Sequence, residues 1–173
     1  LTFIRSDDKD WNETISSVKK LLLHNQMKLF HVVRLGECSV AILTGHEGYP
    51  VQKFEDENRI YLLDGCIYNL RGKELTRSLQ YLADKVFNNI SIKDWLLNVD
   101  GEFVLLIFDK NCGRIAILND SLGRLPTFYL VSDHSFIISR EAKVPLSFHR
   151  TAEFDLMGIA EYLLFGYNLG CNT

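Results

Sequence analysis

The chain of 173 residues lacks the long apolar segment that a membrane-spanning helix needs, since its densest apolar run, Phe103 to Phe108, has only the length of a strand. Its first ten residues lack the basic start and apolar middle of a signal peptide. The chain also has no large excess of charge of either sign, because 19 basic and 22 acidic residues leave a net charge of -3. Without a broad positive field, we expect a cytoplasmic protein that binds neither membranes nor nucleic acid.

Motifs for metals, cofactors and common nucleophiles are missing as well. The four cysteines, Cys38, Cys66, Cys112 and Cys171, form no CxxC pair and have no histidine at ligand spacing. The sequence contains no HExxH, no glycine-rich phosphate loop and no GxSxG nucleophile elbow. These absences predict free thiols, no metal site and no cofactor in this chain.

Enough apolar residues are present, 47% of the total, to form one substantial core. Their spacing predicts amphipathic helices at residues 10–25, 72–87 and 155–164. Asp10 with Glu13 three residues later is typical of the capping box that begins a helix. In the last helix, one face of Leu156, Ile159, Ala160 and Leu163 is expected to pack inward, while further apolar side chains are left for an interface.

The remaining apolar runs are typical of strands. Phe30–Arg34 and Cys38–Leu43 predict a hairpin that turns at Gly36. Arg59–Leu63 predicts a strand that ends in a sharp turn at Asp64-Gly65, and residues 44–58 before it read as a surface loop. Four more strands, expected to be consecutive antiparallel neighbours, are Glu102–Phe108, Arg114–Leu118, Thr127–Val131 and Phe136–Ser139.

The run Phe103 to Phe108 contains no polar residue, so both faces of its strand are expected to be buried. Hairpins and helices without regular βαβ alternation favour an α+β layered domain over a doubly wound sheet. Composition and spacing establish no more than this fold class.

Several segments carry a resemblance to a known family, and they are Leu63–Leu70, Asp100–Asp109, Asn119–Tyr129, Ser139–Lys143 and Glu161–Tyr167. In order and spacing they resemble the N-terminal domain of the asparagine synthetases, whose patterns include Asn-Gly-Glu-Ile-Tyr-Asn and Arg-Asp-x-Leu-Gly-x-x-Pro-Leu-Tyr-Tyr. The resemblance implies a class II glutamine amidotransferase domain over residues 1–154. It implies the N-terminal-nucleophile hydrolase fold, a four-layer αββα sandwich of two antiparallel sheets. Residues 155–173 correspond to an exit helix that leads toward a downstream synthetase domain.

The residues that such a glutaminase needs are replaced in this chain. The family uses an N-terminal cysteine, whose own amine serves as its base, whereas this sequence begins with Leu1. The family's asparagine donates to the developing oxyanion, whereas Asp64 presents a carboxylate that repels negative charge. Cys66 replaces the motif's glutamate, and Asn119 replaces the arginine of the later motif. The resemblance therefore marks Asp64, Gly65 and Cys66 as candidate substrate-binding residues and marks no residue as catalytic.

These substitutions favour a glutaminase-inactive domain with a structural or docking role beside an ATP-dependent, amide-forming domain. Its expected partners are the downstream synthetase domain or a second copy of the chain, with a small amino acid as a ligand. Two other hypotheses stay open. The chain is an active amidotransferase whose nucleophilic cysteine lies upstream, or it is a stand-alone module that binds a ligand beside Asp64 and Gly65.

Overall fold

The computed structural model describes residues 1–7, 10–23, 29–149, 153–167 and 169. It is a mixed α+β structure with two antiparallel sheets, and its described part contains five helices. One sheet has the strand order β2-β3-β1-β9-β8, from β1 (Thr2–Ser6), β2 (Leu29–Arg34), β3 (Ser39–Gly45), β8 (Phe128–Val131) and β9 (Ser135–Ser139). The other has the order β4-β5-β6-β7, from β4 (Val51–Glu55), β5 (Arg59–Ile67), β6 (Gly101–Asp109) and β7 (Ile115–Asn119).

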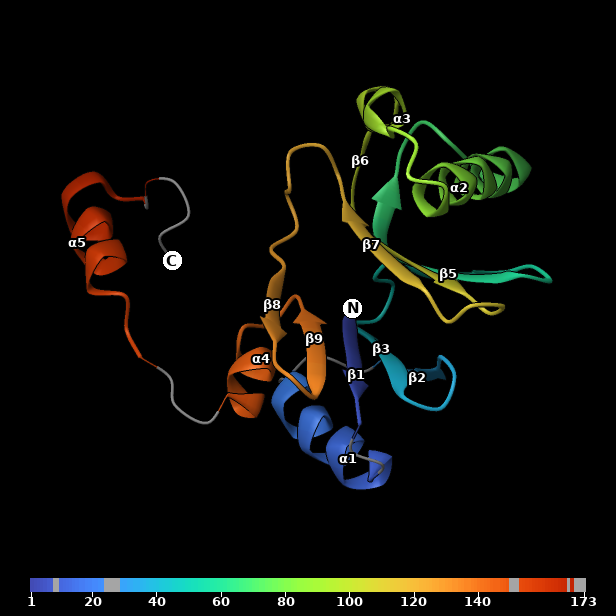
Figure 1. Ribbon diagram of the computed structural model, residues 1–173. Helices are drawn as coiled ribbons and strands as arrows, with labels where there is room; N and C mark the ends of the chain where they lie inside the picture. The colour runs from blue at the N-terminus through green and yellow to red at the C-terminus, as the bar shows by residue number, and fades with distance from the viewer. Residues whose placement is uncertain (8–9, 24–28, 150–152, 168, 170–173) are drawn as a thin grey trace.

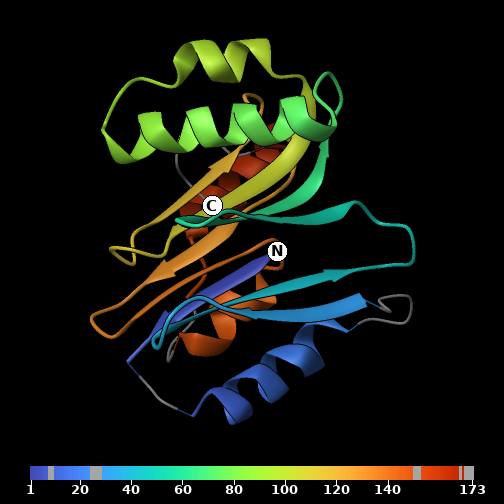
Figure 2. The ribbon, with the colours of Figure 1, turned by 90° about the vertical axis from the view of Figure 1, so that its right-hand side faces the viewer.

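The two sheets lie face to face, with helices over their outer faces (Figure 2). The first pair of helices, α1 (Trp11–Leu22) and α4 (Lys143–Phe148), lies against the five-stranded sheet. The second pair, α2 (Gly72–Phe87) and α3 (Lys93–Asn98), lies against the four-stranded sheet. The last helix, α5 (Leu156–Phe165), stands away from both sheets, beyond the β8 edge (Figure 1). No helix in the described part of the chain is both long and apolar enough to span a membrane.

Three buried apolar clusters join these elements. The middle cluster lies between the sheets, where Phe3, Ala41 and Leu43 of one sheet meet Leu62 and Leu106 of the other. A second cluster joins α2 and α3 to the outer face of the four-stranded sheet. The third joins α1 and α4 to the outer face of the five-stranded sheet. Because burial of apolar surface contributes roughly 25 cal/mol per Å², these clusters supply most of the driving force for folding.

Strand β6 is buried on both faces, as its unbroken apolar run predicts. Phe103, Leu105 and Ile107 contact the helical side, in the cluster that contains α2. Val104, Leu106 and Phe108 contact the other sheet. The strand pairs with β5 on one side and with β7 on the other, both antiparallel.

The helices expected near the N-terminus and in the middle of the chain are confirmed. The Asp10 side chain accepts a hydrogen bond from the Glu13 amide at 3.1 Å, which satisfies one of the free N–H groups at the start of α1. This helix ends at Leu22, short of the expected residue 25, and residues 24–28 lie outside the described part. Helix α2 has the predicted limits, Gly72 to Phe87. The short helices α3 and α4 were not predicted, because six residues carry too little periodic signal.

The expected surface loop over 44–58 is wrong in part, because Val51–Glu55 forms the edge strand β4 beside β5. The charges of Lys53 and Glu55 concealed this strand in the sequence. The two side chains form an ion pair at 2.8 Å and lie partly exposed, opposite Leu62 and Ile60 in the register with β5. Charged residues are common on edge strands, where they prevent unwanted pairing. A short connection, residues 46–50, remains between β3 and β4.

The expected turn at Asp64-Gly65 is also wrong, because β5 continues through both residues to Ile67 in register with β6. Gly65 has a positive φ of 101°, yet it stays inside the strand, and its N–H donates to the Pro50 carbonyl at 2.8 Å. A side chain there would meet the backbone of the neighbouring strand, since a Cβ would lie 2.1 Å from the Glu102 carbonyl oxygen. The glycine thus permits close strand pairing and does not form a turn.

The four strands expected as consecutive neighbours divide between the two sheets. β6 pairs with β7 and β8 pairs with β9, each antiparallel as predicted. β7 and β8 are not paired, because the chain crosses from one sheet to the other between Asn119 and Phe128. Asp120 shapes the start of this crossing, where its carboxylate accepts the backbone N–H groups of Leu122 and Arg124.

The C-terminal helix forms as expected, with Asp155 as its N-cap and Gly166 in the left-handed conformation at its end. The prediction that one of its faces packs inward is wrong. Leu156 and Leu163 are each 78% exposed, and within the helix only Gly158 is buried. The apolar pattern was read correctly, but this helix contacts neither sheet as a covering layer.

We expect Gly65→Ala to destabilise the protein strongly. The variant combines the cost of a positive φ, about 1–2 kcal/mol, with overlap between its Cβ and the Glu102 carbonyl. We predict a loss of about 3 kcal/mol or more in the free energy of unfolding, measured by chemical denaturation.

Gly48→Ala is the matched control, because Gly48 also has a positive φ, 80°, but a Cβ there meets nothing within 4 Å. This variant is expected to lose only the conformational cost of about 1–2 kcal/mol. Equal losses in the two variants would show that the close approach of β5 and β6 at Gly65 is unimportant.

Candidate functional site

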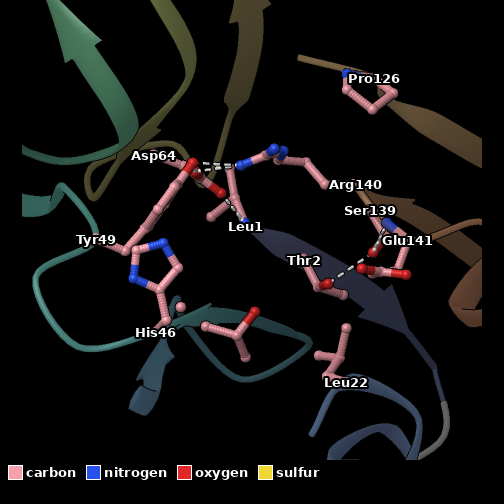
Figure 3. A pocket seen from close by; sticks show the side chains of 12 residues that line it. Leu1, Thr2, Leu22, His46, Tyr49, Asp64, Pro126, Ser139, Arg140 and Glu141 are labelled. Atoms are coloured by element: carbon pink, nitrogen blue, oxygen red, sulfur yellow. Dashed lines mark hydrogen bonds and ion pairs between the residues drawn. The ribbon is translucent and has the colours of Figure 1, made fainter. Parts of the chain in front are cut away.

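A cavity of about 250 Å³ opens at one end of the two sheets, near the start of β1. Its walls come from β1, from the connection between β3 and β4, from β5, and from the end of β9 with the two residues that follow (Figure 3). Segments from both sheets therefore meet here, although they are far apart in the sequence. The cavity is the best candidate for a functional site, since ligand sites are concave and combine apolar walls with a few polar groups.

Asp64 is the buried charge in this cavity. It follows Ile60 and Leu62 along β5 at alternate positions, so its side chain lies on the face directed toward the other sheet. Its relative exposure is 0%. A buried carboxylate is strongly destabilising unless charged or hydrogen-bonding partners compensate it, and the cavity wall supplies such partners.

Arg140 and Tyr49 are two of these partners. One terminal nitrogen of the Arg140 guanidinium lies 2.9 Å from an Asp64 carboxylate oxygen. The Tyr49 hydroxyl donates to the same oxygen at 2.7 Å and accepts a hydrogen bond from Arg140. Arg140 directly follows β9, and Tyr49 lies in the connection that precedes β4, so the cluster joins the two sheets at the cavity (Figure 3).

The amino group of Leu1 is the third partner of Asp64. It forms an ion pair with the second carboxylate oxygen, and both groups are almost wholly buried. The Leu1 carbonyl accepts the Arg140 backbone N–H at 3.3 Å, which holds the start of β1 beside the end of β9. The Leu1 side chain packs into the cluster between the sheets. Position 1 thus presents an apolar side chain, with no nucleophilic atom, beside the carboxylate.

The pKa values of this cluster follow from burial and from the charges nearby. Burial acts to raise the pKa of the Asp64 carboxyl, but the Leu1 amino group, Arg140 and the Tyr49 hydroxyl outweigh it and hold that pKa below its usual value. Burial lowers the pKa of the Leu1 amino group, against the pull of Asp64. Burial, together with the negative charge of Asp64, raises the pKa of Tyr49 to about 12. Asp64 is therefore an ionised acceptor near neutral pH.

A second polar group in the cavity consists of hydroxyls. Thr2 Oγ1 and Ser139 Oγ lie 2.8 Å apart, paired across the neighbouring strands β1 and β9. Ser139 Oγ also accepts the backbone N–H of Glu141 at 3.0 Å. His46 stacks edge-on against Tyr49, and its Nδ1 contacts the adjacent Glu47 carbonyl at 3.0 Å. Among the described residues, neither hydroxyl is hydrogen-bonded to a histidine or carboxylate that would act as its base.

The site residues predicted from the sequence do not all lie in the cavity. Asp64 lines the cavity, but Gly65 and Cys66 are not part of its wall. The N–H of Gly65 is already bonded to Pro50, and the Cys66 thiol is half-buried and contacts the Ile67 carbonyl at 3.6 Å. Cys38 and Cys112 are exposed free thiols, and Cys171 lies outside the described residues.

Sequence reasoning missed Tyr49, Arg140, Thr2 and Ser139 as parts of the site. Tyr49 lies in the segment that the sequence predicts to be a surface loop. Arg140 lies in a motif that served only as evidence for the family resemblance. A sequence signal existed for Arg140, since a buried Asp64 demands a cation, but the strand order that brings Arg140 to it is a tertiary feature. No group of three or more histidine, cysteine or acidic side chains suited to hold a metal ion occurs in the part of the chain that the structure covers.

Comparison with protein-family models finds no match for this chain, and comparison with curated protein sequences finds none either.

We expect Asp64→Asn to lower the free energy of unfolding by about 3–5 kcal/mol near neutral pH, because the substitution leaves the buried Leu1 amino group and the partly buried Arg140 without their counter-charge. Folding holds the pKa of Asp64 below the value near 3.9 of an unfolded chain. The stabilisation by Asp64 is therefore present above that pH and is lost as the pH falls through the folded pKa. The difference between wild type and variant should narrow below about pH 4, as measured by urea denaturation across a pH series.

Asp84→Asn is the control, because the ion pair of Asp84 with Arg59 is at the surface, with Asp84 64% exposed. Its loss should be below about 1 kcal/mol. A loss of the same size for Asp64→Asn would contradict the stabilising role of the buried cluster.

We expect Tyr49→Phe to remove one tyrosine that ionises only at unusually high pH. The pKa of Tyr49 is raised to about 12, so the neutral hydroxyl stabilises the fold below about pH 10, and this stabilisation is lost as the pH rises toward 12. A titration followed by tyrosinate absorbance should show less late-titrating amplitude in the variant. Loss of the hydrogen bond to Asp64 should also lower the free energy of unfolding by about 1.5–3 kcal/mol.

Tyr61→Phe serves as the comparison, since burial also raises the pKa of Tyr61 to about 12 but its hydroxyl donates to Asp56, away from the cavity. Each variant should remove one late-titrating group and leave the other. If Tyr49→Phe leaves the titration unchanged, the hydroxyl of Tyr49 is exposed to solvent and does not contact Asp64.

Proposed function

We propose that the chain is a glutaminase-inactive, amidotransferase-like domain with a structural or docking role beside an ATP-dependent, amide-forming domain of an asparagine-synthetase-like protein. The architecture supports this proposal. Two antiparallel sheets face each other, with α2 and α3 outside one and α1 and α4 outside the other. That order supports the four-layer αββα sandwich that the resemblance implies.

One observation carries the proposal, namely the contact between residue 1 and Asp64. In the resembling family, the nucleophile at the start of the first strand faces the Asn-Gly motif. Here Leu1 faces the corresponding Asp64, although 63 positions separate them in the chain. This contact supports the proposal, because it joins the two positions at which the resemblance places the nucleophile and the oxyanion motif. Their chemistry has changed, because leucine supplies no nucleophile and a carboxylate paired with Arg140 supplies no oxyanion donor.

We expect the purified chain to release no ammonia from glutamine above the rate in buffer. Asp64→Asn restores the side-chain type of the family motif, yet it too should be inactive, because position 1 still lacks a thiol. A class II amidotransferase with an intact N-terminal cysteine serves as the positive control. Turnover by the purified chain that one substitution in it abolishes would contradict the proposal and favour an active enzyme.

A thiol-directed glutamine analogue tests the same proposal by a different readout. Cys66 is half-buried in β5, whereas Cys38 and Cys112 are exposed. We expect mass spectrometry to find slower modification at Cys66 than at the two exposed thiols, with no protection by added glutamine. Stoichiometric modification of Cys66 that glutamine prevents would identify it as a nucleophile.

A second candidate function is the binding of a small carboxylate-bearing ligand, such as an amino acid, in the cavity beside Asp64. Within the described part of the chain, Arg140 Nε is buried and has no hydrogen-bond partner. Such a donor is costly to leave unsatisfied, so a ligand carboxylate or a water molecule suits this place. L-glutamine and acetate are suitable probes in an NMR titration, in which binding should shift the backbone amide resonances of the cavity residues Thr2, Ser139 and Glu141, and Arg140→Lys should reduce these shifts.

A further inference from the structure

Three cationic residues occur at the start of helix α2, which lies on the outside of the four-stranded sheet (Figure 2). Arg71 directly precedes the helix, Lys73 lies in its first turn and Arg77 in its second, and all three are exposed. Within the described part of the chain, their side chains form no hydrogen bond and no ion pair. By contrast, Lys53 and Arg59 of the neighbouring strands β4 and β5 are each paired with a carboxylate.

The placement of these cations opposes the dipole of the helix. The N-terminus of a helix carries a partial positive charge, so acidic residues stabilise it and cations are unfavourable there. Glu74 is the acidic residue of the first turn, and Arg71 gives the free backbone N–H groups no side-chain cap. A local rule that is broken with no compensating contact in the fold commonly marks a functional surface. This end of α2 is therefore suited to an anionic partner.

A shallow hollow lies between the start of α2 and the edge strand β4. It has a volume of about 480 Å³ and is lined by Phe54 of β4 and by Gly72, Lys73, Thr76 and Arg77. Phe54 is partly buried and packs against the cluster beneath α2, so it adds an apolar part to the wall. No carboxylate is among the described residues that line the hollow. The hollow therefore combines two unpaired cations with an aromatic surface.

We propose that this hollow docks an acidic peptide segment of a partner protein, with carboxylates beside Lys73 and Arg77 and an apolar side chain against Phe54. Charge complementarity identifies the partner, because a cationic surface attracts an anionic one and disfavours basic or neutral competitors. A hollow this open leaves a small anion largely hydrated, whereas a peptide covers the cations and the aromatic side chain together. The proposal does not rest on the proposed function, because it involves neither the cavity beside Asp64 nor glutamine chemistry.

The surroundings of the hollow favour a short acidic peptide over nucleic acid. Nucleic-acid binding requires a broad positive surface, whereas this chain has a net charge of -3. Glu55 of β4, and Glu74 and Asp84 of α2, are exposed on the two elements that form the hollow. A phosphate chain that extends along these elements would be repelled by the carboxylates. A peptide segment confined to the hollow contacts cations and no carboxylate.

An NMR titration of the full chain tests the proposal. The probe is the peptide Asp-Glu-Leu-Glu-Asp, acetylated and amidated at its ends. It should shift the backbone amide resonances of Phe54, Gly72, Lys73 and Thr76 and reach saturation. The affinity should fall several-fold as NaCl rises from about 50 to about 500 mM, because salt screens exposed charges. Serine in place of the leucine should weaken binding by about fivefold or more, since it removes the apolar contact with Phe54.

Charge reversal separates the hollow from the net charge of the chain. Lys73→Glu and Arg77→Glu should each weaken peptide binding by about tenfold, because each replaces an attraction by a repulsion. Lys73→Glu should nevertheless be at least as stable to heating as the wild type, since an acid in the first turn suits the helix dipole. Arg34→Glu is the matched control, because Arg34 is an exposed arginine at the end of β2 in the other sheet. It should change the affinity by less than about twofold.

Three results would overturn the proposal. The first is the absence of saturable shifts at Gly72, Lys73 and Thr76 with peptide up to roughly 5 mM, a concentration that would populate even a weak complex. The second is equal weakening by Lys73→Glu and Arg34→Glu, which would show that net charge alone attracts the peptide. The third is tighter binding of a single-stranded DNA oligonucleotide at the same amides, which would assign the hollow to nucleic acid.

Discussion

Strand β6 contacts the helical cluster with one face and the opposite sheet with the other, and this double burial is the constraint on which the remaining architecture depends. Phe103, Leu105 and Ile107 seat α2 and α3, while Val104, Leu106 and Phe108 face β1 and β3 across the gap between the sheets. Because the two sheets pack face to face, the ends of particular strands of one sheet lie opposite particular strands of the other. The cavity exists because the start of β1 and the end of β9 lie opposite the second half of β5.

The buried charge of Asp64 is tolerated because both sheets compensate it. Arg140 comes from the end of β9, the Leu1 amino group from the start of β1, and Tyr49 from the connection that leads into β4. A buried ion pair often stabilises a protein less than apolar packing of the same volume, and it contributes more to the choice of one arrangement. Here it ties β5 to the start of β1 and the end of β9, which belong to the other sheet, and to Tyr49 just before β4. The same contacts occupy the carboxylate and remove it from acid–base chemistry.

The apolar side chains of the two sheets are buried under other elements, whereas those of α5 and of the β8 edge are exposed to solvent. Residues of the three clusters are buried from every side, and Gly65 allows β5 and β6 to approach without a side chain between them. The β8 edge and α5, by contrast, leave aromatic and aliphatic groups in solvent. Contiguous exposed apolar surface of this kind marks an interaction site or an aggregation hazard.

The sequence by itself determined the local features. These are the Asp10 cap of α1, the full length of α2, the two buried faces of β6 and the left-handed Gly166 that ends α5. Such features depend on neighbours within a few positions, or on a periodicity that repeats over several residues. The tertiary structure alone decided that β4 pairs with β5, that β5 passes straight through Gly65, and that β7 and β8 belong to different sheets. It also decided the composition of the site. The sequence marked Asp64 as anomalous, but its partners Tyr49 and Arg140 lie 15 and 76 positions away, and only the packing of one sheet on the other brings their charges and hydroxyls together.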